Sequence, residues 1–157
     1  MSHILQDIFV PFYQSIPNNV GGMIVYSSDK KKHRGLTMEK LKAIFHVDEA
    51  IKWRLTLGNV KNFIQDVGSE AVLVEIVANA AAVQLFALEA QATKENVELL
   101  QQMQELSSQK VTIIACRNAL KANSIREEVL PAFITLVPAG VTRIIRRQAE
   151  GYAYVKP

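Results

Sequence analysis

The segment VTIIACRNALKANSI (111–125) contains the one cysteine of the chain, and the cysteine thiol is a natural candidate for nucleophilic chemistry. An apolar run leads into Cys116, and Arg117 and Asn118 follow directly, where a short helical pattern begins. A thiol reacts as its thiolate, and an adjacent cation and the amides of a helix N-terminus both stabilise that anion. Asn118 could cap the helix or donate to the sulfur. The alternative is that Cys116 is a small buried hydrophobic residue, the common fate of a free cysteine.

Other polar side chains lie within or just after apolar segments. His46 could act as a base or orient a ligand, or it could be a hydrogen-bonded structural residue. Asp48 is expected to cap the helix that follows it. Asn79 comes directly after an apolar segment and is a supporting candidate for the same site. Glu75 lies inside that segment, and because a buried carboxylate is costly unless paired, we expect it to meet an arginine across a subunit interface.

Several other chemistries lack the sequence patterns that they need. The chain contains no glycine-rich phosphate loop, no His-Glu-x-x-His motif, no Cys-x-x-Cys pair and no serine in a nucleophile-elbow pattern. We therefore expect neither a bound metal nor a cofactor.

The composition is that of an ordinary globular protein. The chain has 157 residues, of which 49% are hydrophobic and 21% charged, and its net charge is +3. It has no long apolar run, no secretory pattern at its start and only one cysteine, so we expect a cytoplasmic protein that does not bind a membrane. The basic run Lys30-Lys31-Lys32-His33-Arg34 has no aromatic partners and is expected to be solvated rather than to bind nucleic acid.

The chain divides into two parts near Gly35. Residues 1–36 combine prolines, glycines and the basic run, which indicates an extension with little regular structure that could pack on a neighbouring subunit. Residues 37–157 alternate apolar runs with helical patterns and are expected to form the folded domain.

Short apolar runs in this second part predict five strands, over residues 41–47, 71–78, 111–116, 133–137 and 152–156. Amphipathic stripes between them predict helices: one after Asp48 that ends near Gly68, one over 80–106 that Thr93 caps in part, one after Cys116 and one ending at Gly151. This alternation is typical of a three-layer α/β/α fold with a mainly parallel sheet. Sites in such sheets lie at the carboxyl ends of strands, which here carry residues 46–48, 79–81 and 116–118.

Four segments together resemble the DsrE/DsrF-like family. They are FHVDEAIKWRLTLGNVKNFI, VEIVAN, VTIIACRNAL and VPAGVTRIIRRQAEGYAYVKP, in this order and spacing, and the resemblance extends over about residues 41–157. It implies a three-layer α/β/α fold with a five-stranded sheet and homo-oligomers, often trimers or hexamers. It also implies an intracellular sulfur carrier or sulfurtransferase-like protein, in which Cys116 holds the persulfide and passes sulfur to a partner sulfur-carrier protein.

One departure from the family pattern leaves a second function open. Many relatives carry a glycine-rich turn after the second strand, where this chain has Asn79-Ala80-Ala81-Ala82. Because alanine adopts a positive φ only at a cost, we expect a turn of different shape. The alternative to a sulfur carrier is therefore a non-catalytic homo-oligomeric protein of the same fold that binds a small ligand or a partner.

Overall fold

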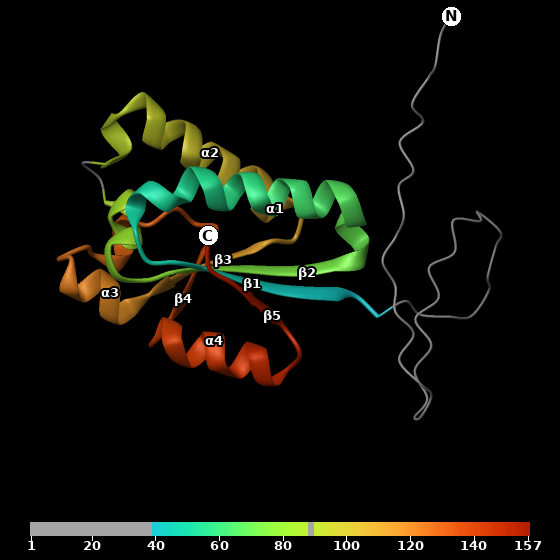
Figure 1. Cartoon of the computed structure of the whole chain (residues 1–157). Helices are drawn as coiled ribbons and strands as arrows, with labels where there is room; N and C mark the ends of the chain where they lie inside the picture. The colour runs from blue at the N-terminus through green and yellow to red at the C-terminus, as the bar shows by residue number, and fades with distance from the viewer. Residues whose placement is uncertain (1–38, 88–89) are drawn as a thin grey trace, which may run out of the picture. The chain divides into compact units, whose positions relative to one another are not determined.

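The computed structural model describes residues 39–87 and 90–157, which build a five-stranded sheet with helices on both faces (Figure 1). The extension 1–36 and its basic run lie outside the described residues, so the expectations for them stay predictions. None of the helices in the described ranges is long and apolar enough to cross a membrane.

All five strands run parallel, in the order β4-β3-β2-β1-β5. Parallel neighbours need a crossover between them, and the helical segments between the apolar runs supply it. The strands follow the runs in the sequence to within a residue at each end: β1 Leu41–Val47, β2 Val72–Ala78, β3 Thr112–Cys116, β4 Ile134–Val137 and β5 Ala153–Val155. Only the last crossover changes direction, because it returns the chain from β4 to pair β5 with β1.

The helices form the outer layers. On one face of the sheet lie α1 (Trp53–Val67) and α2 (Lys94–Ser108), and on the other lies α4 (Gly140–Ala149) (Figure 1). A shorter helix, α3 (Arg117–Ala122), follows β3 without a loop. The three-layer α/β/α fold expected from the sequence is confirmed.

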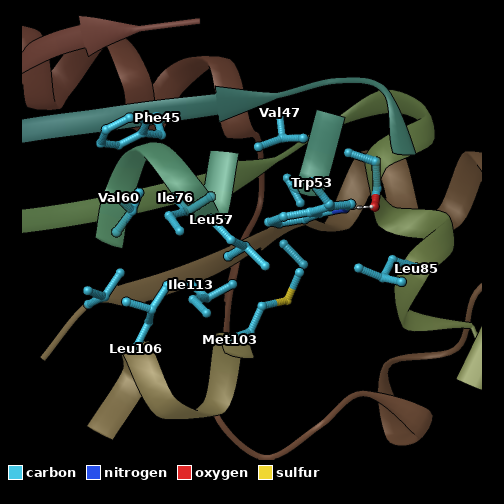
Figure 2. Close-up of a cluster of buried hydrophobic side chains, with 14 of the residues drawn as sticks. Phe45, Val47, Trp53, Leu57, Val60, Ile76, Leu85, Met103, Leu106 and Ile113 are labelled. Atoms are coloured by element: carbon cyan, nitrogen blue, oxygen red, sulfur yellow. Dashed lines mark hydrogen bonds between the residues drawn. The ribbon is translucent and has the colours of Figure 1, made fainter. Parts of the chain in front are cut away.

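The main core lies between the sheet and the α1–α2 layer. Its side chains alternate along the strands and recur at helical spacing on α1 and α2, and the turn after β2 adds Leu85. Figure 2 shows Phe45, Val47, Trp53, Leu57, Val60, Ile76, Leu85, Met103, Leu106 and Ile113. The Trp53 indole is fully buried, and its Nε1 donates to the carbonyl oxygen of Ala82 at 2.9 Å. A smaller core under α4 consists of Ile44, Val77, Ile114 and Ile144.

Local structure differs from the sequence-based expectation in two places. Residues 80–86 and 90–92 form 3-10 turns, and the α-helix begins only after Thr93, whose side chain accepts from the Asn96 amide. Asp48 does not cap α1, because a 3-10 turn with Glu49 at its N-cap precedes the helix. Its carboxylate accepts instead from Lys156 Nζ, which ties the end of the chain to β1.

Candidate functional site

The carboxyl edge of the sheet brings three sequence-predicted segments together. The strands β1, β2 and β3 are neighbours and run in the same direction, so their last residues lie along one edge. His46 is near the end of β1, Asn79 follows β2, and Cys116 ends β3. A shared edge is a consequence of parallel pairing, and it is the usual place for a site in this class of fold.

Cys116 is the N-cap residue of α3 and is only 3% exposed. The first residue of α4 packs against it: a Cβ placed on Gly140 would lie 3.3 Å from Cys116 Cβ and 3.6 Å from Asn79 Cγ. Cys116, Asn79 and Gly140 therefore meet at one point, although they come from three separate parts of the sequence. The sequence pattern does not single out Gly140, whose one clue is its position at the start of a helical stripe just after a strand.

Arg117 and Asn118 both lie on the surface. The guanidinium Nε of Arg117 donates to Glu127 Oε1 at 2.9 Å, in an ion pair that is about half exposed. Asn118 lies inside the first turn of α3, and because Cys116 holds the N-cap position, Asn118 does not cap this helix. Their proposed roles at the sulfur thus stay predictions.

The turn after β2 has an unusual backbone. Ala80 has a φ of +43°, a backbone conformation that is costly for alanine. The expected difference in shape from the turn of relatives stays a prediction. Two side chains hold Ala80 in this conformation. Asn79 Oδ1 accepts from the Ala80 amide at 2.9 Å, and Asn123 Nδ2 donates to the Ala80 carbonyl oxygen at 3.1 Å. Since Asn123 is the C-cap of α3, the turn is attached to the helix that Cys116 begins.

His46 is bound to the edge strand β5 rather than to β3. Its Nδ1 lies 2.9 Å from Tyr154 Oη, and its Nε2 is buried and has no hydrogen-bond partner among the described residues. Burial lowers the pKa of His46, and the charge of Asp48 offsets part of this effect. Because β2 separates β1 from β3, His46 and Cys116 belong to strands that are not adjacent.

Comparison with known proteins identifies the family. The model of the DsrE/DsrF-like family matches residues 61–157, more than half of the chain and including Asn79, Cys116 and Gly140. The chain belongs to the DsrE/DsrF-like family. No curated protein sequence matches the chain.

A solved structure shares this fold. It is MTH1491, a protein of unknown function from Methanobacterium thermoautotrophicum, which is 30% identical to this DsrE/DsrF-like chain. The match has a TM-score of 0.65 and covers 75% of this chain and 100% of that one.

In this DsrE/DsrF-like chain, Glu75 pairs with arginines of its own subunit, so the expected partner across an interface is wrong. Glu75 lies on β2 and is 3% exposed, and α4 packs above it. Arg143 donates to both carboxylate oxygens, at 2.8 and 2.6 Å, and Arg147 Nε donates at 2.8 Å. Burial alone would raise the pKa of Glu75, but these hydrogen bonds outweigh it and lower the pKa. The carboxylate is therefore held ionised beneath α4.

Proposed function

We propose that this protein carries sulfur in the cytoplasm as a persulfide on Cys116. The single observation that carries the proposal is the position of the chain's one cysteine, at the carboxyl end of β3 in a chain of the DsrE/DsrF-like family. A second thiol-bearing carrier protein would receive the sulfur, and the working form would be a homo-oligomer.

The chemistry needs only thiol exchange. The Cys116 thiolate attacks the outer sulfur of a persulfide donor, the donor's S–S bond breaks, and the donor leaves as a thiolate. The product is a Cys116 persulfide, and the same displacement by an acceptor thiolate removes the sulfur again. No metal, cofactor or external oxidant enters this balance.

Intact mass spectrometry tests the proposal. Incubation with a low-molecular-weight persulfide should add about 32 Da, the mass of one sulfur, and a second thiol should remove it. Cys116→Ser should show no labile mass. Arg117→Ala should slow loading severalfold because it removes the cation that directly follows Cys116 in the chain, whereas Arg126→Ala removes another exposed cation and should not.

One observation favours a second candidate function. Cys116 is 3% exposed, as expected for a cysteine that serves as a small apolar residue. The protein would then be a non-catalytic oligomer that binds a ligand or partner at this edge. If several donors leave no labile mass on a thiol that iodoacetamide can still alkylate, the carrier proposal fails and this candidate replaces it.

A further inference from the structure

The cover over Cys116 is formed by helix backbone. A Cβ on Gly140 would lie 3.1 Å from Val77 Cγ1 and 3.3 Å from Cys116 Cβ, both closer than ordinary van der Waals contact. Gly140 is itself buried at the start of α4. The first turn of this helix therefore packs against the β-carbon of Cys116 with no intervening side chain, and the cysteine as a whole is only 3% exposed.

The same segment of α4 is held to the sheet by charge. Arg143 comes one turn after Gly140 on the same side of the helix, and Arg147 comes one turn later. Both donate to Glu75, at distances between 2.6 and 2.8 Å. Glu75 lies inside β2, a strand paired on both sides, so its carboxylate is a fixed anchor point for α4.

Few apolar contacts hold α4 on the sheet. Within the helix only Gly140 and Ile144 are buried, whereas Val141 is 54% exposed and Ile145 61%. A segment with few buried apolar contacts opens more readily than the core of the same protein. Among the contacts of α4, the ion pairs to Glu75 therefore make a large contribution to holding the helix on the sheet.

We propose that the first turn of α4 is a gate over Cys116 and that Glu75 is its latch. The gate would open by a shift of the first turns of α4 away from the sheet, without unfolding of the strands. Its existence does not depend on sulfur transfer, but its use to control the loading of Cys116 rests on the function proposed above.

The rate of Cys116 alkylation by iodoacetamide, measured with increasing urea, tests the gate. For the natural chain we expect a weaker dependence on urea than that of global unfolding, because a local opening exposes less surface. Glu75→Gln should raise the alkylation rate without urea by about tenfold or more, since it removes the charge that both arginines bind. Arg147→Gln leaves Arg143 in place, so it should raise the alkylation rate less. This variant tests the proposal if Glu75→Gln does not fold.

Two controls separate the gate from general destabilisation. Leu106→Ala removes core packing on the opposite face of the sheet, and Glu70→Gln breaks an exposed ion pair with Lys110. Neither should change the alkylation rate without urea. If Leu106→Ala accelerates alkylation as much as Glu75→Gln does at an equal loss of global stability, the gate does not exist. Because no sulfur donor is used, this result is independent of whether Cys116 forms a persulfide.

Discussion

Ala80 shows how single residues shape the edge that carries Cys116. A non-glycine residue with a positive φ places its Cβ close to a backbone oxygen, which costs roughly 1–2 kcal/mol. The two asparagines that bond the Ala80 amide and carbonyl offset this cost and keep the turn in one conformation. Strain that is held in this way is often found next to functional sites.

Ala80→Gly should therefore stabilise the protein. Glycine relieves the strain but loses more backbone entropy on folding, so the net gain in the free energy of unfolding should be about 0.5–1 kcal/mol. Urea unfolding followed by circular dichroism measures it. Ala81→Gly is the matched control, because Ala81 does not have a positive φ, and it should lose about 0.5–1 kcal/mol. Equal losses in the two variants would mean that Ala80 is not strained.

At the scale of elements, β5 is the most weakly attached strand. It has three residues, pairs only with β1 and lies at the edge of the sheet. Two side-chain contacts add to this pairing: His46 with Tyr154, and Asp48 with Lys156. Both contacts depend on protonation state, so the attachment of β5 should depend on pH.

Stability should fall as the pH is lowered from about 6.5, the ordinary pKa of histidine. Burial lowers the pKa of His46 in the folded state, so below this pH the unfolded chain binds more protons than the folded one. Asp48 acts in the same direction at lower pH, because its hydrogen bond with Lys156 lowers its pKa, and this contribution is lost as the carboxylate protonates.

Urea unfolding at pH 7.5, 6.5 and 5.5 measures the effect of His46. His46→Gln keeps a polar group that can reach Tyr154 but has no charge to gain. The variant should therefore lose less stability than the natural chain between pH 6.5 and 5.5. An unchanged dependence on pH would show that His46 is not its source.

At the scale of the whole molecule, the two faces of the sheet are unequally covered. Within residues 39–87 and 90–157, the long helices α1 and α2 lie on one face, and α4 lies on the other (Figure 1). Val141 and Ile145 are exposed on α4, and Leu73 of β2 is also partly exposed. We expect these apolar side chains to be buried between copies of the chain.

Light scattering at micromolar concentration should give at least twice the chain mass of 17.5 kDa. Ile145→Asp should reduce this mass, because it places a charge in the expected interface. Ile51→Asp changes a residue that is 82% exposed in the turn before α1 and should not. A monomeric natural chain would contradict the expectation. Because α4 also covers Cys116, association through this helix would slow the opening of the gate, so alkylation rates must be compared at one protein concentration.

The sequence by itself determined the order of the elements, the parallel sheet and the position of Cys116 at a strand end. These features depend on local patterns: apolar runs of strand length, stripes at helical spacing, and the crossovers that parallel strands require. The family resemblance carried by the same segments was confirmed by the match over residues 61–157.

The tertiary structure alone decided what surrounds Cys116 and Glu75. Arg143 and Arg147 lie 68 and 72 residues from Glu75 along the chain, and the arginine-rich stripe on α4 does not reveal whether its partner is in the same subunit. The contact between Gly140 and Cys116 and the positive φ of Ala80 likewise depend on how α4 and α3 pack against the sheet. A periodic pattern specifies which face of a helix is buried, but the residues that this face meets are set only when the layers come together.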